Sequence, residues 1–120
     1  MGRTKLVKIW VDDIRPKPDD YDFRVKSVFG FIYLLGKLSV AQRDNPILLN
    51  LDHDAGEYVA EGGDYIKILE FLDANLTGAG CPVDTVRVCF HSGNPVGVKN
   101  MRRIVAHSDC MMEVKDEDLD

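Results

Sequence analysis

Three short stretches of the chain place ionisable side chains directly after an apolar run. Asp12 and Asp13 follow KIWV, Asp52 and His53 follow ILLNL, and His91 follows VRVCF. Carboxylates held close together repel one another, and a Mg²⁺ or Mn²⁺ ion, which takes oxygen ligands, would relieve that repulsion. Histidine transfers protons near neutral pH. These residue types point to metal-assisted chemistry on a phosphate.

Other residues near these stretches could bind the phosphate itself. Ser92, Gly93 and Asn94 follow His91 and precede a proline, a pattern typical of a helix N-terminus. Backbone N–H groups at such a terminus favour an anion, and a glycine lets the backbone approach it closely. Arg15, just past the first acid pair, offers a guanidinium for bidentate phosphate contact. We therefore predict a substrate-binding role for Arg15, Ser92, Gly93 and Asn94.

Each of these residues also has an ordinary structural explanation. Acids are common at strand ends, and Asp54 could bond its own backbone in the turn that follows. Asn94 and Ser92 could serve only as helix caps. His53 and His91 could be buried histidines with satisfied hydrogen bonds. Chemistry is favoured only if the three stretches lie together in the fold.

The order of strand-like and helix-like segments predicts that they do. Apolar, β-rich runs predict strands at residues 5–12, 23–28, 47–52, 84–90 and 109–114. Apolar residues at helical spacing predict helices at residues 29–41, 64–76 and 95–107. Strands that alternate with helices imply a parallel sheet covered on both faces, with ligands bound at the carboxyl ends of the strands. The three ionisable stretches are then expected at one edge.

Composition limits the kind of molecule and of partner. The 120 residues, 45% of them apolar, predict one domain at residues 1–115 and an acidic tail at residues 116–120. The net charge of −5 argues against tight binding to duplex nucleic acid, but a small anionic substrate suits the nearly neutral body. No apolar run reaches the roughly 18–20 residues of a membrane span. The three cysteines include no Cys-x-x-Cys, which predicts reduced thiols and a location in the cytoplasm.

Four motifs together resemble one known family. WVDDIRP, LDHDAGEY, GGDYIKILEFL and HSGNPVGVKNM are similar to the motifs of cyclic-phosphate processing receiver domains, and they extend from about residue 8 to residue 106. The resemblance implies a flavodoxin-like α/β fold, a three-layer, doubly wound sheet of five mostly parallel strands in the receiver order 2-1-3-4-5. The segment IRPKPDDYD, residues 14–22, stands where a receiver has its first helix.

The resemblance also implies roles for particular residues. Asp12 and Asp13 match the metal-binding acids of a receiver, and Asp52 matches its phosphoacceptor. His91 or Ser92 falls at the position of the receiver hydroxyl. The implied cofactor is Mg²⁺ or Mn²⁺, held by the three acids.

An enzyme is the favoured hypothesis. The resemblance implies a phosphoesterase that processes cyclic or terminal phosphates on nucleotide-like or RNA-derived substrates. Asp52, His53 and His91 are the expected catalytic residues, with one histidine as acid and the other as base, in an order that the sequence leaves open.

Two other classes stay open. The chain could be a signalling receiver phosphorylated on Asp52, with Lys115 near the position of the receiver lysine, although the proline that usually follows that lysine is missing. The sequence HDAGEY also replaces the usual receiver turn after the acceptor. A third hypothesis is a module that binds a phosphate end without turning it over.

Overall fold

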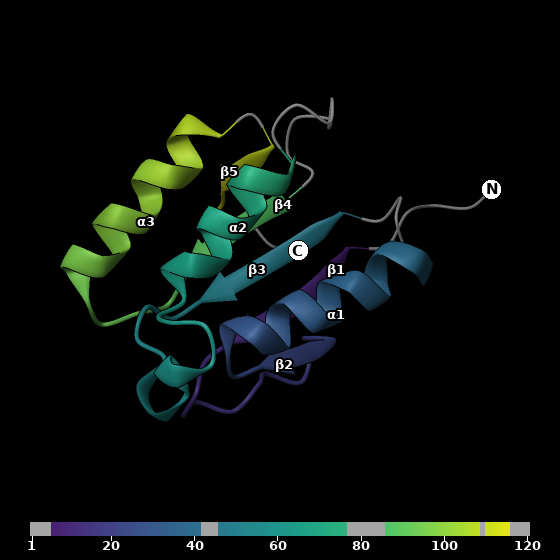
Figure 1. Cartoon of the computed structure of the whole chain (residues 1–120), viewed down its shortest axis with the longest axis horizontal. Helices are drawn as coiled ribbons and strands as arrows, with labels where there is room; N and C mark the ends of the chain where they lie inside the picture. Colours follow the sequence, from purple (N-terminus) through teal and green to yellow (C-terminus); the bar gives the residue numbers. More distant parts are fainter. Residues whose placement is uncertain (1–5, 42–45, 77–85, 109, 116–120) are drawn as a thin grey trace.

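The chain forms one parallel sheet of five strands in the order β2-β1-β3-β4-β5 (Figure 1). The structure is a computed structural model that describes residues 6–41, 46–76, 86–108 and 110–115. The strands are β1 (Val7–Val11), β2 (Phe23–Val25), β3 (Ile47–Leu51), β4 (Val86–Phe90) and β5 (Met111–Glu113). The helices are α1 (Val28–Ala41), α2 (Ile66–Leu76) and α3 (Pro95–His107), with a short 3-10 helix, η1 (Gly56–Ala60), before α2. The predicted α/β class, number of strands and strand order are confirmed.

The three central strands end level with one another. Val11 of β1 pairs with Leu51 of β3, and Leu51 pairs with Phe90 of β4. The pairing continues past the strand ends, because Asp52 N donates to Val11 O and His91 N donates to Leu51 O, each at 3.0 Å. The polar residues that follow these strands therefore begin side by side.

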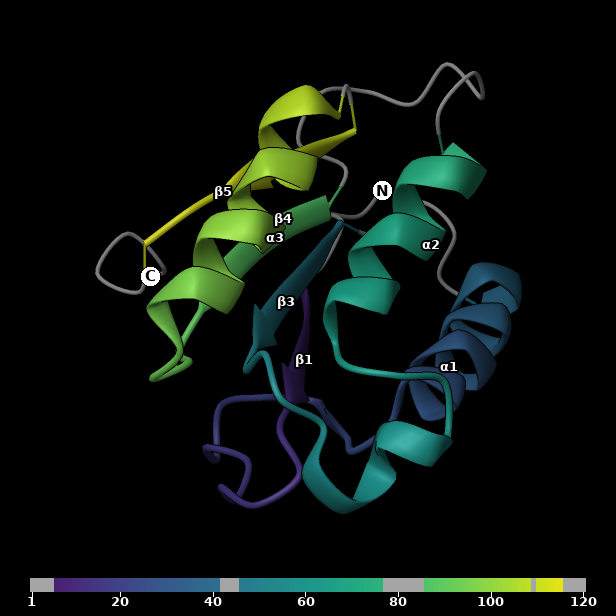
Figure 2. The ribbon, with the colours of Figure 1, turned by 60° about the vertical axis from the view of Figure 1, so that its left-hand side comes forward.

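All three helices pack on one face of the sheet (Figure 2). Alternate strand residues point to this face and meet the buried side chains of the helices in one apolar cluster. Its members include Ile9, Val11, Leu49, Leu51, Val88, Phe31, Ile68, Leu72, Met101 and Val105. α1 contacts α2, and α2 contacts α3, as neighbours in a single layer do. The expected three-layer arrangement is thus corrected to two layers within the described part of the chain.

The handedness of parallel crossovers explains this one-sided arrangement. The connections through α1, α2 and α3 all step in the same direction across the sheet, from β2 past β1 to β3, then to β4 and β5. Right-handed crossovers that step in one direction lie on one face. Only the step from β1 to β2 runs the other way, and no helix forms there in residues 12–22. The predicted replacement of the first helix by a loop is confirmed.

This loop covers part of the opposite face. Trp10, Leu48 and Cys89 point to that face and form a smaller apolar cluster with Tyr21 of the loop. The Tyr21 ring meets the Trp10 ring edge-on, with centroids 5.4 Å apart. Trp10 is buried in this cluster. The loop is therefore anchored on the sheet by an aromatic contact rather than by a helix.

Two expectations from composition have mixed outcomes. Cys89 is a buried thiol outside any disulfide, whereas Cys110 is disulfide-bonded, which corrects the expectation of reduced thiols throughout. No helix in the described residues is long and apolar enough to cross a membrane. The predicted acidic tail at residues 116–120 lies outside the described residues.

Candidate functional site

Three carboxylates meet at the carboxyl ends of β1 and β3. One oxygen from each of Asp12, Asp13 and Asp52 lies within 4.8 Å of the others. Gly56 makes room for this cluster, because it has a φ of +57° and a Cβ there would overlap the Asp13 carboxylate. The structure thus brings the three predicted acids together.

Asp12 is held tightly by its own loop. Its Oδ1 accepts hydrogen bonds from Ile14 N at 2.8 Å and Arg15 N at 2.9 Å, and its Oδ2 lies 2.8 Å from His91 Nε2. Burial alone would raise the pKa of Asp12, but the hydrogen bonds from the Arg15 and Ile14 backbone and from His91 outweigh burial, so the pKa lies below its usual range. Asp12 is therefore a fixed anion in a buried position.

The negative charge of the cluster acts on its surroundings. Burial raises the pKa of Tyr65, and the charges of Asp13, Asp12 and Asp52 raise it further. Within the described residues, no lysine or arginine forms an ion pair with Asp13 or Asp52. Local groups therefore leave much of this charge uncompensated.

This donor set fits a hard divalent cation. Asp13 has no hydrogen-bond partner among the described residues, and Asp52 accepts only from His53 N, at 2.8 Å through Oδ1. Carboxylate oxygens in an open, partly solvated cluster are the ligands that Mg²⁺ and Mn²⁺ prefer. Asp13 and Asp52 have the most coordination capacity left, because both oxygens of Asp12 already accept hydrogen bonds.

His91 is enclosed by groups from β1 and β3. Its Nε2 contacts Asp12, and its Nδ1 lies 2.6 Å from Asn50 Oδ1. Its ring lies flat on Trp10, with centroids 4.0 Å apart and an interplanar angle of 5°. Asn50 is held in turn by Tyr21, whose hydroxyl accepts from Asn50 Nδ2 at 2.8 Å. Both ring nitrogens of His91 thus have partners inside the protein.

Sequence reasoning did not find this supporting network. The sequence patterns marked none of Trp10, Asn50 and Tyr21 as a site residue. The sequence carried one signal, because Asn50 is the single polar residue of the apolar run ILLNL. In the structure Asn50 is only 1% exposed. A buried amide inside a strand needs a hydrogen-bond partner, and a neighbouring strand end is where such a partner can lie.

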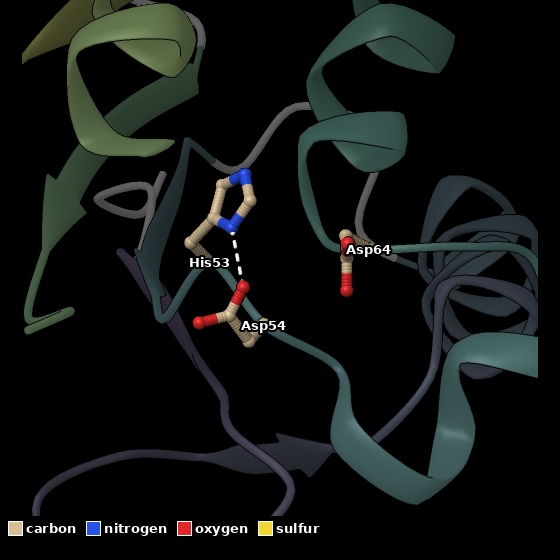
Figure 3. A group of neighbouring side chains, drawn as sticks. All are labelled: His53, Asp54 and Asp64. Carbon is tan, nitrogen blue, oxygen red and sulfur yellow. Dashed lines mark hydrogen bonds and ion pairs between the residues drawn. The ribbon is translucent and has the colours of Figure 1, made fainter. Parts of the chain in front are cut away.

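His53 lies in a second group, with Asp54 and Asp64 (Figure 3). Its Nδ1 is 2.8 Å from Asp54 Oδ1, while its other ring nitrogen points away from Asp54 and has no partner among the described residues. Asp64 Oδ1 accepts from Ala55 N at 3.0 Å and so closes the turn after β3. The carboxylate of Asp54 therefore fixes the orientation of the His53 ring and leaves Nε2 available.

The beginning of α3 packs against the His53 ring. Asn94 caps the helix as predicted, with its Oδ1 accepting from Gly97 N at 3.0 Å. The Asn94 Nδ2 lies 3.5 Å from Asp54 Oδ1 and 3.4 Å from His53 Nδ1. A Cβ at Gly97 would overlap the His53 ring, so only glycine permits this close contact.

The two histidines leave the strand ends on opposite faces of the sheet. His91 contacts Trp10 and Asn50 on the face without helices, whereas His53 contacts Gly97 of α3 on the helical face. They follow neighbouring strands, as predicted, but they belong to different hydrogen-bonded groups.

The predicted substrate-binding residues lie beside one or the other of these groups. Arg15 Nη1 donates to His91 O at 2.9 Å, which holds the guanidinium at the strand ends. Ser92 Oγ accepts from Asn94 N at 3.1 Å, and Gly93 is exposed with open space around it. Lys115 is exposed, and no ion pair within the described residues joins it to the acids.

The fold and the acid cluster define a receiver-like α/β domain. The chain matches the family model of the cyclic-phosphate processing receiver domain over residues 7–107, and it therefore belongs to this family. The resemblance inferred from the four motifs is confirmed. Comparisons with curated proteins and with solved structures find no match.

Proposed function

We propose that this chain is a phosphoesterase that opens or hydrolyses a cyclic or terminal phosphate on a nucleotide-like or RNA-derived substrate. The observation that carries the proposal is the pairing, at one set of strand ends, of a three-carboxylate cluster with an oriented histidine that has a free nitrogen. A phosphorelay site does not need that histidine. Membership of the cyclic-phosphate processing family supports the same substrate class.

Proton transfer is assigned to His53. The ester ring opens when water forms a bond to phosphorus and one ring P–O bond breaks. His53 Nε2 takes the proton from the water, and the leaving oxygen takes a proton from solvent. Asp54 holds the ring through Nδ1 and stabilises the imidazolium that forms.

His91 is assigned a positioning role, which revises the expectation that it shares acid–base work with His53. Both of its ring nitrogens are occupied by Asp12 and Asn50. It fixes Asp12 from one side, while the backbone of Ile14 and Arg15 fixes it from the other. Asp12 is thereby kept ionised and in place.

The carboxylates are proposed to hold Mg²⁺ or Mn²⁺, chiefly through Asp13 and Asp52 with Asp12 beside them. When bound, such an ion neutralises charge on the phosphoryl oxygens and acidifies water. Arg15 and the backbone of Ser92 and Gly93 bind the remaining phosphate oxygens. A location in the cytoplasm stays a prediction.

A turnover assay tests the proposal. Wild type and His53→Gln are given nucleoside 2′,3′-cyclic phosphates with Mg²⁺, with Mn²⁺ or with chelator. We expect metal-dependent formation of a phosphate monoester and a fall in kcat of about 10²–10⁴-fold in His53→Gln, the range for a general base. His107→Gln is the matched control, because among the described residues the side chain of His107 hydrogen-bonds only the Arg103 carbonyl, at the far end of α3.

Two other outcomes would favour the other classes. Full turnover by His53→Gln would remove His53 from the mechanism. No turnover by folded wild type, together with an acyl-phosphate mass shift on Asp52 after treatment with a small phosphodonor and Mg²⁺, would support a signalling receiver. Tight binding of cyclic phosphates without product would support a binding module.

A further inference from the structure

A pocket lies beside the candidate site, between the end of β4 and the first half of α3. It has a volume of about 410 Å³, which lies in the roughly 300–1,000 Å³ range of small-molecule sites. We call it the Phe90 pocket. Its lining residues are Phe90, Ser92, Gly93, Pro95, Val98 and Arg102.

One wall of the Phe90 pocket is built from two flat groups. The Arg102 guanidinium carbon lies 5.7 Å from the centre of the Phe90 ring. Glu113 of β5 holds this guanidinium, because Arg102 Nε donates to both carboxylate oxygens, at 2.9 and 3.1 Å. The terminal nitrogens of Arg102 have no partner among the described residues. The side chain is thus kept in place while its outer surface stays free.

The chemistry of this lining suits an uncharged planar ring. Phe90, Pro95 and Val98 supply apolar surface, and both arginine and aromatic planes stack on heteroaromatic rings. The free N–H groups of Arg102 can donate to acceptors on the edge of such a ring. A second phosphate is less suited, because Glu113 already neutralises Arg102.

The pocket shares Ser92 and Gly93 with the residues proposed to bind phosphate. Ser92 and Gly93 line it and directly follow His91, whose ring contacts Asp12. Phe90 pairs with Leu51, the residue before Asp52, so the pocket begins one strand away from the acid cluster. Adjacent strands are about 4.8 Å apart, a distance within the length of one nucleotide.

We propose that the Phe90 pocket receives the heteroaromatic base of the substrate, with the cyclic phosphate at the acid cluster. This inference rests on the proposed phosphoesterase function and narrows its substrate to a nucleotide that carries a base close to the reacting phosphate. Base-free sugar phosphates would lose this contact.

Steady-state kinetics on two substrates test the proposal. The first is adenosine 2′,3′-cyclic phosphate, and the second is the methyl riboside 2,3-cyclic phosphate, which lacks the base. We expect Arg102→Met to raise KM for the nucleotide about tenfold, a typical loss for one base-stacking contact, with kcat within about twofold. The KM for the methyl riboside should not change. Arg103→Met is the control, since Arg103 is exposed on the same helix and does not line the pocket.

Equal KM values of wild type for the two substrates would overturn the base-binding role while leaving the phosphoesterase intact. The same conclusion would follow if Arg102→Met impaired both substrates equally. If no substrate is turned over, the phosphoesterase proposal fails, and the pocket is then tested alone by saturation-transfer NMR with adenosine. Saturation transfer to adenosine that is lost in Arg102→Met but kept in Arg103→Met would support base binding in the pocket. If wild type does not bind adenosine, the proposal is wrong.

Discussion

His91 Nε2 lies 2.8 Å from Asp12 Oδ2 across two strands that are not neighbours, because β3 runs between β1 and β4. Both side chains are almost fully buried, at 10% and 1% exposure. The contact crosses over Asn50 of the intervening strand, which binds the other nitrogen of His91. The histidine thus ties three strand ends together at the point where the carboxylates gather.

The Tyr21 hydroxyl should stabilise the fold through its hydrogen bond with Asn50. Tyr21→Phe removes the acceptor of the Asn50 amide and should destabilise the fold by about 1 kcal/mol, the usual value of one hydrogen bond. Urea denaturation followed by the fluorescence of Trp10, the single tryptophan, measures this. Tyr33→Phe is the control, because Tyr33 is 67% exposed on α1. Equal losses in both variants would mean that the Asn50 contact contributes nothing.

Stability should fall in acid because of Asp12. Its pKa is lower in the folded chain than in the unfolded chain, so the unfolded chain binds more protons between the two values. The stabilisation is complete above the unfolded value of about 4 and is lost as the pH falls through the folded value. Asp12→Asn should flatten the dependence of the urea midpoint on pH below about 5.

Asp20→Asn is the comparison for this acid effect. The hydrogen bond and the charge of Lys8 also lower the pKa of Asp20, but that carboxylate is exposed and its ion pair is screened by salt. Asp20→Asn should change the dependence of the urea midpoint on pH below about 5 less than Asp12→Asn does. The effect of Asp20→Asn should be smallest at high salt. If Asp12→Asn left the dependence of the urea midpoint on acid pH unchanged, the role assigned to Asp12 would be contradicted.

A pair of glycine substitutions should separate positioning from stability. Gly97→Ala places a methyl group where the His53 ring lies, so the ring must move and kcat should fall at least tenfold, short of the full loss of a general base. Gly36→Ala on α1 meets nothing within 4 Å and should stabilise the helix by about 0.5–1 kcal/mol. Turnover and thermal melting of both variants provide the test. Unchanged turnover in Gly97→Ala would show that the position of His53 is not critical.

Divalent ions should stabilise the wild type through the acid cluster. A ligand that binds only the folded chain increases the free energy of unfolding, by about 2.7 kcal/mol when its concentration is 100 times Kd. The melting temperature rises accordingly. Asp13→Asn should abolish the shift that Mg²⁺ produces, because Asp13 belongs to the acid cluster and its carboxylate has no hydrogen-bond partner among the described residues. Asp64→Asn tests the second group of possible ligands, and loss of the shift in that variant alone would move the ion to His53, Asp54 and Asp64.

Much of the fold could be predicted from local patterns. The strand and helix segments were found because apolar spacing and turn residues are local, and the Asn94 cap was found from an Asn–Pro pair. The observed ends differ by a few residues, as at β1, which was expected at residues 5–12 and is observed at Val7–Val11. The sequence predicted no helix between residues 52 and 64, whereas the structure has the 3-10 helix η1 there, since so short a helix leaves no periodic pattern.

The contacts of the site were harder to predict. That Asp12, Asp13 and Asp52 meet follows from parallel topology, because all three follow strands. The network of His91 with Trp10 and Asn50 depends on which face each side chain takes and on what covers that face. The expectation of helices on both faces concealed this network, because the face without helices is where the loop brings Tyr21 to Asn50.

The one-sided helical layer divides the site between two packing units. His53 belongs to the helical face through Gly97, whereas His91, Trp10 and Asn50 belong to the face covered by the loop. The larger apolar cluster lies under the helices, so most of the stability resides on that side. Loosening of the loop would therefore release His91 and its hold on Asp12 while the helices and His53 stay folded.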